Sequence, residues 1–339
     1  MPAARAYSRP ATLAPEGQPI PTGEGGFTVA LEPPTLAEVS GSNTGVAGVW
    51  SFGSGQPGPH TCLVALVHGN EFAGALALRR LIAAGIVPAR GRLSLVFANL
   101  EAFARFDRRN PTASRYVEED LNRLWCRAVL DGARDSAELR RARALRPIFD
   151  TVDALLDLHS MLWDSDPLLL CGATEKARRL ALAIGTPPLV VSDQGHVGGR
   201  RLIDYRPFAD PGTARAAVLV EAGQHWQPAT VTAMLETTAA LLRQTGQIGE
   251  AEAGRLAAPR AVPPPVLAQV TMTVTAESSD FRFVRPFRGG EVVRERNTLI
   301  ALDGDAEIRT PHDDCILVMP SLRTCRGHTA VRLARRAEA

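Results

Sequence analysis

The sequence predicts an α/β fold with a mixed, mostly parallel central sheet and helices on both faces, followed by a small C-terminal all-β domain. Up to residue 246, short apolar runs of strand length alternate with segments of helical period, as in layered α/β proteins. After residue 265 the helical period is replaced by short alternating segments with Gly-Gly and Asp-Gly turns. We therefore expect an N-terminal arm (residues 1–45), an α/β domain (46–246), a linker (247–265) and a C-terminal β domain (266–339).

The expected elements follow in order along the chain. The arm is irregular apart from a strand at Phe27–Leu31, and Gly48–Phe52 and Thr61–Val67 flank the turn sequence Ser54–Gly58, which predicts an antiparallel pair. A helical period then covers Glu71–Ala84. Further expected helices are Leu121–Leu130, Ala137–Phe149 (capped by Ser136), Glu175–Ile184 and Val231–Gln244. Further expected strands are Leu93–Ala98, Ala154–Leu158, Leu168–Leu170, Leu189–Val191, Ala217–Val220, Leu267–Thr275, Phe281–Val284, Thr298–Leu302 and Cys315–Met319.

Composition excludes several classes of function. The net charge of the 339 residues is +2, so no broad basic field for nucleic acid is expected. Lys176 is the single lysine, which excludes the phosphate-binding loop that requires a Gly-Lys pair. The longest apolar runs are shorter than the ~20 residues of a membrane helix. Five scattered cysteines and an N-terminus without an apolar signal core indicate a cytoplasmic protein.

The sequence His68-Gly69-Asn70-Glu71 stands where an apolar strand ends and a helix begins. Ligands bind at the carboxyl ends of strands in open α/β sheets. The turn allows His68 and Glu71 to converge, and an imidazole with a carboxylate suits zinc. The alternative is that the pair occurs by chance, with Glu71 facing the positive end of the helix.

A third ligand is expected from Asp157-Leu158-His159-Ser160, which directly follows the apolar run Ala154–Leu156. His159 would complete the three protein ligands of a catalytic zinc site, and Asp157 could orient a ligand imidazole. The alternative is an ordinary buried histidine with its hydrogen bonds satisfied. His196 and His225 are further candidates for neighbours of the site.

Two other motifs carry charged side chains in loops or at strand ends. In Arg115–Arg123 (RYVEEDLNR), adjacent Asn and Arg side chains can grip a carboxylate, although the segment could also be a solvated cluster that caps the next helix. Glu221, in Val220-Glu221-Ala222-Gly223, follows the apolar run Ala217–Val220. There it could act as general base beside a metal, or simply form a salt bridge.

Taken together, HGNE, RYVEEDLNR, DLHS and VEAG, followed by a β-rich region, resemble the succinylglutamate desuccinylase/aspartoacylase family, relatives of the zinc carboxypeptidases. The resemblance spans roughly Val46 to Arg335. It implies a carboxypeptidase-like sheet, one zinc ion per chain and hydrolysis of the amide bond of small N-acyl amino acids. The residue roles that it implies are zinc binding by His68, Glu71 and His159, proton transfer by Glu221, polarisation of the scissile carbonyl by Arg115, and binding of the substrate carboxylate by Asn122 and Arg123.

The sequence departs from the family at two places. The C-terminal domain has no tyrosine, whereas some members use one from that domain. Three arginines, Arg200, Arg201 and Arg206, could match the one that reads an acidic side chain or acyl group. The acyl group and the amino acid therefore stay open.

The sequence favours a zinc-dependent amidohydrolase that deacylates a small N-acyl amino acid, without a nucleic acid or membrane partner. One alternative is a zinc carboxypeptidase that acts on peptides. Another is a non-catalytic metal-binding protein on the same fold, although such a protein would need neither Glu221 nor Arg115. Whether the chain forms a homo-oligomer stays open.

Overall fold

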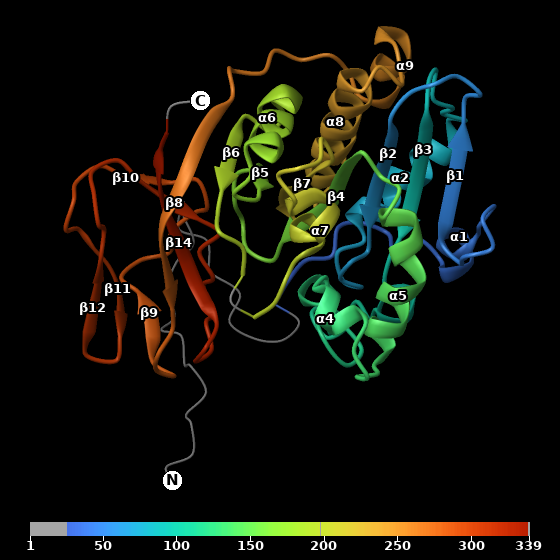
Figure 1. Cartoon of the computed structure of the whole chain (residues 1–339). Coiled ribbons are helices and arrows are strands. Elements are labelled where there is room, and N and C mark those ends of the chain that lie inside the picture. Colours follow the sequence, from blue (N-terminus) through green and yellow to red (C-terminus); the bar gives the residue numbers. More distant parts are fainter. Residues whose placement is uncertain (1–25, 197, 338–339) are drawn as a thin grey trace. The chain divides into compact units, whose positions relative to one another are not determined.

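The structure is a computed structural model that describes residues 26–196 and 198–337. The chain divides into two compact units (Figure 1). Among the described residues, the larger unit comprises Thr28–Ser160 and Pro167–Pro265, and the smaller one comprises Gly26, Phe27, Met161–Asp166 and residues 266–337.

The larger unit is built on a mixed sheet with the strand order β1-β3-β2-β4-β7-β5-β6. The central strands β2, β3 and β4 are parallel, and β5 is parallel to β6, whereas β1 and β7 run antiparallel to β3 and β5 respectively. The mixed, mostly parallel sheet is therefore confirmed. Its strands are β1 (Val49–Gly53), β2 (His60–Ala65), β3 (Arg92–Phe97), β4 (Ala154–Met161), β5 (Leu168–Cys171), β6 (Leu189–Ser192) and β7 (Ala216–Gln224).

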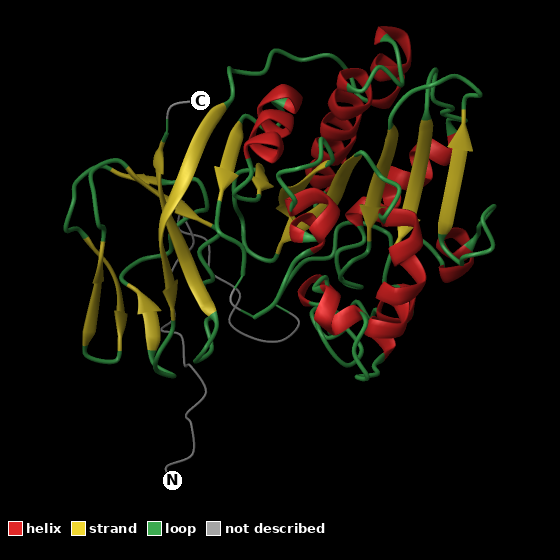
Figure 2. Ribbon diagram, viewed as in Figure 1, coloured by secondary structure: helices red, strands yellow, loops and turns green. Residues whose placement is uncertain are grey.

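Helices flank this sheet (Figure 2). Helix α8 packs against both α2 and α6. Gly74 lets α2 approach the sheet closely, because a Cβ there would lie 3.0 and 3.1 Å from the Cβ atoms of Ala65 and Leu158. The helices are α1 (Leu36–Ser40), α2 (Ala73–Ala83), α3 (Leu100–Phe103), α4 (Arg127–Leu130), α5 (Ala137–Phe149), α6 (Glu175–Ile184), α7 (Arg206–Ala209), α8 (Pro228–Gln244) and α9 (Glu250–Leu256), with 3₁₀ turns η2 (Leu121–Arg123) and η3 (Leu202–Asp204).

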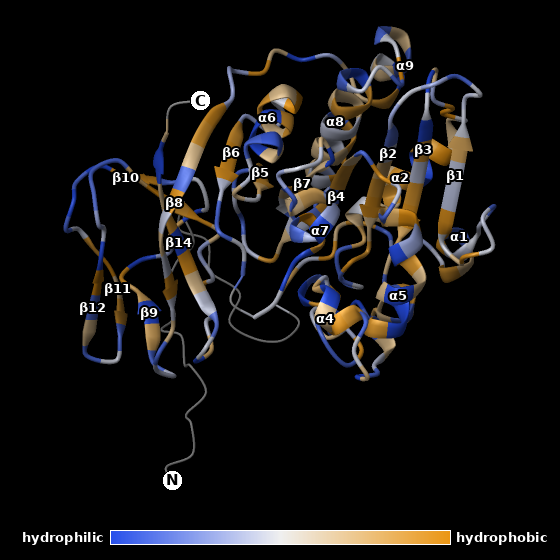
Figure 3. Ribbon diagram, viewed as in Figure 1, coloured by the Kyte–Doolittle hydropathy of each residue, from blue (hydrophilic) through white to orange (hydrophobic). Residues whose placement is uncertain are grey.

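The core of the larger unit lies along its central strands. Every residue of β2 and of β4 is buried, as expected for parallel strands covered on both faces. Figure 3 shows apolar residues along these strands. Polar groups interrupt the apolar run of β4 from its middle onward, at Asp157, His159 and Ser160. The buried polar residues are therefore concentrated where the strand approaches the edge of the sheet.

Several local expectations were wrong. Gly48–Phe52 and Thr61–Val67 do not pair, because β3 lies between β1 and β2 and forms hydrogen bonds with both. Phe27–Leu31 contains no strand. The expected helix Leu121–Leu130 is broken into η2 and α4, since Cys126, which precedes α4, has extended dihedral angles.

Other differences concern where elements begin and end. Helix α9 lies inside the segment expected to be a linker, where Glu250 and Glu252 in its first turn stabilise the helix start. Strands β4 and β7 run past their expected ends, so His159 and Glu221 lie within strands rather than after them. Helix α5 begins after Ser136 as expected, with the Ser136 side chain as its N-cap.

The smaller unit is antiparallel, and residues 266–337 contain no helix. Strands β8, β14, β13 and β10 pair in that order, and β12, β11 and β9 form a separate sheet. Their shared core includes Phe281, Phe283, Ile300, Leu317 and Leu333. The strands are β8 (Val266–Thr275), β9 (Phe281–Phe283), β10 (Val292–Val293), β11 (Leu299–Asp303), β12 (Ala306–Arg309), β13 (Cys315–Val318) and β14 (Thr329–Arg336). The expected small β domain is therefore confirmed.

Candidate active site

His68, Glu71 and His159 converge at the carboxyl edge of the large sheet. His68 lies in the turn after β2, Glu71 lies just before α2, and His159 lies on β4. Because β2 and β4 are parallel neighbours, the chain brings the three residues to one edge. One side-chain N or O atom from each lies within 4.8 Å of the other two, and all three residues are buried.

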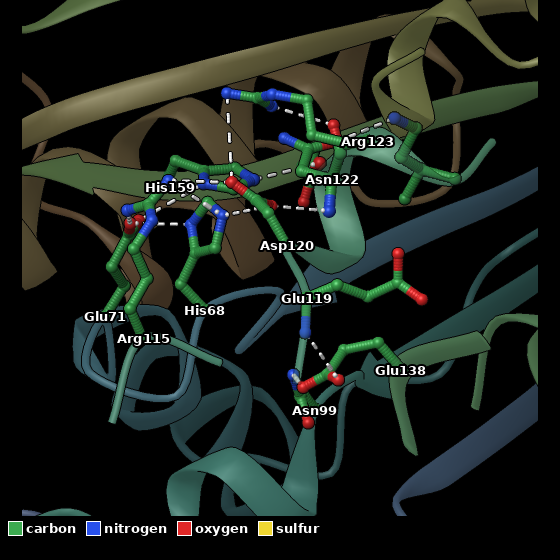
Figure 4. A network of polar contacts seen from close by, with 12 residues as sticks. His68, Glu71, Asn99, Arg115, Glu119, Asp120, Asn122, Arg123, Glu138 and His159 are labelled. Atoms are coloured by element: carbon green, nitrogen blue, oxygen red, sulfur yellow. Dashed lines mark hydrogen bonds and ion pairs between the residues drawn. The ribbon is translucent and has the colours of Figure 1, made fainter. Parts of the chain in front are cut away.

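The Glu71 carboxylate lies between the two imidazoles (Figure 4). Its Oε1 is 2.7 Å from Nδ1 of His68, and its Oε2 is 3.1 Å from Nδ1 of His159. The backbone N–H of Ser160 also donates to Oε2, at 3.0 Å. Burial raises the pKa of Glu71, but the two imidazoles outweigh this effect and hold the pKa well below its ordinary value.

The other ring nitrogens face carboxylates. Nε2 of His68 is 3.0 Å from Asp120 Oδ1, and Nε2 of His159 is 3.1 Å from Asp157 Oδ2. Burial lowers the pKa of His159, but Asp157 and Glu71 raise it well above its ordinary value. Two imidazoles that share one buried carboxylate, each with an acidic partner behind it, match the donors and supporting contacts that zinc sites use, so these residues could hold a metal ion.

Gly69 allows the Arg115 segment to approach this turn. The Gly69 N–H donates to the Arg115 carbonyl at 3.1 Å. A Cβ at Gly69 would lie 2.4 Å from the carbonyl carbon of Ala102, and 2.5 Å from both the Phe103 nitrogen and the Ser114 oxygen. The backbone packing therefore requires glycine here.

Arg115 reaches the same cluster. Its Nη1 donates to Glu71 Oε1 at 3.2 Å, and its Nη2 lies 3.0 Å from His68 Nε2. Burial lowers the pKa of Arg115, but the carboxylates of Asp120, Glu71 and Glu221 raise it above its ordinary value. A permanently charged guanidinium therefore stands beside the His-Glu-His cluster.

Asp120 joins the charged groups of this segment, although the sequence analysis gave it no role. Its Oδ1 accepts the Asn122 N–H at 2.8 Å, and its Oδ2 lies 3.4 Å from Arg115 Nη2 and 3.8 Å from Arg123 Nη2. Burial raises the pKa of Asp120, but His68, Arg115 and Arg123 lower it far below its ordinary value. The only sequence signal was an acidic residue two positions before an asparagine.

Asn122 and Arg123 both lie in η2. The Asn122 side-chain oxygen accepts the Leu202 N–H at 2.8 Å, which directs the amide hydrogens the other way. Nη1 of Arg123 donates to the Asn122 carbonyl at 2.8 Å. Gly199 packs so closely against the Arg123 backbone that a Cβ at residue 199 would lie 2.3 Å from the Arg123 carbonyl oxygen.

Glu221 is buried on β7, which is the neighbour of β4 in the sheet. The Ala216 N–H donates to the Asp153 carbonyl at 2.9 Å, which joins the beginnings of the two strands. Their carboxyl ends therefore lie at the same edge. The influence of the Glu221 charge on the pKa of Arg115 agrees with this placement.

The two further histidines differ in their surroundings. His225 is buried, and its Nδ1 lies 2.8 Å from the Ser160 hydroxyl. Burial lowers the pKa of His225 to about 4, so its imidazole is neutral at pH 7. His196 instead lines a pocket of about 370 Å³ with Thr174, Arg200 and Phe208, and the lining of this pocket includes none of the three cluster residues.

The three candidate arginines for substrate recognition also differ. Arg201 is buried, and its guanidinium binds both oxygens of Asp193, at 2.6 and 2.9 Å, and Asp204 at 2.7 Å. All three guanidinium nitrogens therefore have carboxylate partners within the protein. Arg200 and Arg206 are exposed and line separate pockets.

Comparison with known proteins decides the family. A sequence model described as the succinylglutamate desuccinylase/aspartoacylase catalytic domain matches residues 57–245, more than half of the chain. The chain belongs to the succinylglutamate desuccinylase/aspartoacylase family. Members of this family are hydrolases that remove acyl groups from amino acids. No curated protein matches the sequence.

Several solved structures share the fold of this chain. The succinylglutamate desuccinylase of Vibrio cholerae is 17% identical, with a TM-score of 0.63 over 83% of this chain and 82% of that one. A succinylglutamate desuccinylase/aspartoacylase from Rhodobacter sphaeroides is 20% identical, with a TM-score of 0.61 over 84% and 87%. The ectoine utilization protein EutE (DoeB) from Ruegeria pomeroyi, solved with product bound, is 16% identical, with a TM-score of 0.57 over 82% and 86%. In the described part of this chain, every helix is too short or too polar to cross a membrane.

Proposed function

We propose that this protein is a zinc-dependent deacylase that hydrolyses the amide bond of a small N-acyl amino acid. The observation that carries the proposal is the buried cluster of His68, Glu71 and His159 with the Arg115 guanidinium against it. A protein that only binds a metal ion would need the three ligands alone. Acyl transfer also requires a cation directed at the same point, because negative charge develops on the carbonyl oxygen during the reaction.

The residues divide the reaction between them. Zinc held by His68, Glu71 and His159 would supply Lewis acidity, which lowers the pKa of water to about 7 and polarises a carbonyl. Glu221 accepts the proton of the attacking water and returns it to the leaving amine. The Arg115 guanidinium donates hydrogen bonds to the carbonyl oxygen as its negative charge grows.

Asn122 and Arg123 would bind the α-carboxylate of the amino acid. The contact between the Asn122 side-chain oxygen and the Leu202 N–H leaves the amide hydrogens as donors for an anion. Arg123 adds a charged guanidinium from the adjacent position. An anchor for one carboxylate is consistent with a substrate the size of an acylated amino acid.

A zinc carboxypeptidase would use similar metal chemistry on peptides. The product-bound structure of the ectoine utilization protein, which has the same fold, favours a small substrate by analogy. Because Asp193 and Asp204 occupy Arg201, only Arg200 and Arg206 remain from the sequence analysis as candidates for reading a second acidic group of the substrate.

The test combines metal analysis with a panel of N-acyl amino acids. We expect about one zinc-class ion per chain and hydrolysis of at least one member of the panel. Glu221→Gln should keep the metal and the fold but lower kcat by roughly 10²–10⁴-fold, because the amide cannot accept the proton. Near-normal turnover in this variant would contradict the mechanism, and a protein that binds no metal would contradict the proposed function.

A further inference from the structure

Segment Arg115–Arg123 has two sets of partners. Arg115 and Asp120 contact the His-Glu-His cluster, and Arg123 lies 3.8 Å from Asp120, whereas the two glutamates between Arg115 and Asp120 bind the start of α5. Oε2 of Glu118 accepts the Ala137 N–H at 2.5 Å, and the Ser136 hydroxyl donates to Glu119 Oε1 at 2.5 Å. The two glutamates of this motif therefore contact the start of α5 and not of α4, the helix that directly follows the motif.

Glu138, in the first turn of α5, makes the reciprocal contact with the segment (Figure 4). Its Oε1 accepts the Val117 N–H at 2.6 Å, and its Oε2 accepts the N–H groups of Glu118 at 3.1 Å and Glu119 at 3.2 Å. The Asn99 side-chain amide donates to Oε1 at 3.0 Å. One fully buried carboxylate therefore collects four donors, three of them consecutive backbone amides.

These hydrogen bonds dominate the electrostatics of Glu138. Burial raises the pKa of its carboxyl group, but the donors from Val117, Asn99, Glu118 and Glu119 outweigh burial and lower the pKa below its ordinary value. The Glu138 carboxylate is therefore charged at neutral pH. The backbone N–H groups of residues 117–119 provide most of the hydrogen bonds that it would otherwise form with water.

Asn99 links Glu138 to the turn that carries His68. The Asn99 N–H donates to the Leu66 carbonyl at 2.7 Å, two residues before His68. The Asn99 side-chain oxygen accepts the Ala102 N–H at 3.2 Å and so caps α3. Glu138 thus joins the end of β2, the Arg115–Arg123 segment and α5 at one point.

We infer that Glu138 is a positioning residue: by holding the backbone amides of residues 117–119, it sets the place of Arg115 on one side and of Asn122 and Arg123 on the other. This inference rests on the proposed function. A displacement of about 1 Å in a positioning group can cost on the order of 100-fold in rate. A purely structural carboxylate at the start of α5 would affect stability but leave the Michaelis constant of the folded enzyme unchanged.

The test uses Glu138→Gln in the full-length, zinc-loaded protein. The amide keeps the shape but retains one acceptor oxygen, so its NH₂ group faces backbone donors. We expect kcat/KM for an N-acyl amino acid to fall by roughly 10–100-fold with a raised KM. The loss of kcat/KM should be smaller for a substrate in which an amide group replaces the α-carboxylate, because that substrate has no carboxylate to position. Amide hydrogen exchange at residues 117–119 should accelerate as well.

Asp303→Asn is the matched control. Asp303 accepts the N–H groups of Glu277 at 2.6 Å and Ser278 at 2.9 Å in the smaller unit, so the same chemical change loosens a different loop. This variant should keep the wild-type KM. If Glu138→Gln does not fold, Asn99→Ser provides the second variant, because serine can still cap α3 but cannot donate the amide hydrogen bond to Glu138.

The outcomes distinguish the two proposals. A folded Glu138→Gln or Asn99→Ser variant with unchanged KM and unchanged exchange at residues 117–119 would overturn the positioning role. Wild-type protein that hydrolyses no member of the panel would overturn the proposed function instead. In that case, amide hydrogen exchange alone would test the role of Glu138. Faster exchange at residues 117–119 in the variant would support the contact between Glu138 and the segment, and equal exchange would refute it.

Discussion

Replacing Arg201 with methionine should destabilise the larger unit strongly. In the wild-type protein, the buried guanidinium binds two carboxylates at once, with N–O distances of 2.6 and 2.9 Å to Asp193 and 2.7 Å to Asp204. Asp193 is itself buried. Methionine has a similar length but no charge, so the two carboxylates would remain together without a cation.

The magnitude follows from this burial. Removing one partner from a buried ion pair typically costs about 3–5 kcal/mol, because the remaining charge is left without compensation. For a folding unit of about 150–250 residues, each kcal/mol lowers the midpoint of thermal unfolding by roughly 2–4 °C. We therefore expect the midpoint of Arg201→Met to fall by roughly 6–20 °C.

The assay is thermal and urea unfolding of the wild-type protein, of Arg201→Met, and of a triple variant that also carries Asp193→Asn and Asp204→Asn. Because the triple variant removes both orphaned charges, it should recover most of the lost stability. A loss below about 1 kcal/mol in Arg201→Met would refute the structural role, since that is the range of exposed ion pairs. Normal stability with weakened substrate binding would show instead that Arg201 serves the substrate.

Three further predictions concern the site itself. Arg123→Ala should lower kcat/KM strongly for substrates with an α-carboxylate and much less for their amides, and equal losses in steady-state kinetics would assign Arg123 a structural role. His68→Ala should lose the metal and some stability, because metal binding is linked to folding, and metal analysis with thermal unfolding will check this. Gly69→Ala should cost about 1–3 kcal/mol in unfolding free energy and reduce activity, because its Cβ would overlap three backbone atoms. Gly53→Ala is its control, since a Cβ there meets no atom within 4 Å, and equal stability of the two variants would contradict the packing at Gly69.

The fold class was predictable because its signals are local. Apolar runs bounded by turn residues mark strands, and parallel strands place their carboxyl ends at one edge, which brings His68 and His159 together. The pairing of β1 could not be predicted from its neighbour in sequence. Strand β3 comes later in the sequence but forms the hydrogen bonds with β1 that β2 was expected to form. The number of residues between β1 and β2 gives no indication of this.

The supporting residues of the site were harder to predict than the candidate ligands. Asp120 stands in a run of acidic residues, and nothing in the run separates it from Glu119, yet one contacts His68 and the other contacts Ser136. Glu138 lies 15 residues beyond Arg123, in a helix whose charged sequence gives no indication of a special role. Its partners are backbone amides, which every residue possesses, so residue type gives no indication of the contact.

The two-sided packing of Arg115–Arg123 has a consequence for how this family can diverge. Surface connections usually accept insertions and deletions. In this segment, one added or deleted residue between Val117 and Asp120 would shift Asp120 away from His68 or the two glutamates away from the start of α5. Among natural relatives, we therefore expect changes in length at exposed turns such as residues 54–59, while the distance in sequence from Arg115 to Arg123 stays constant.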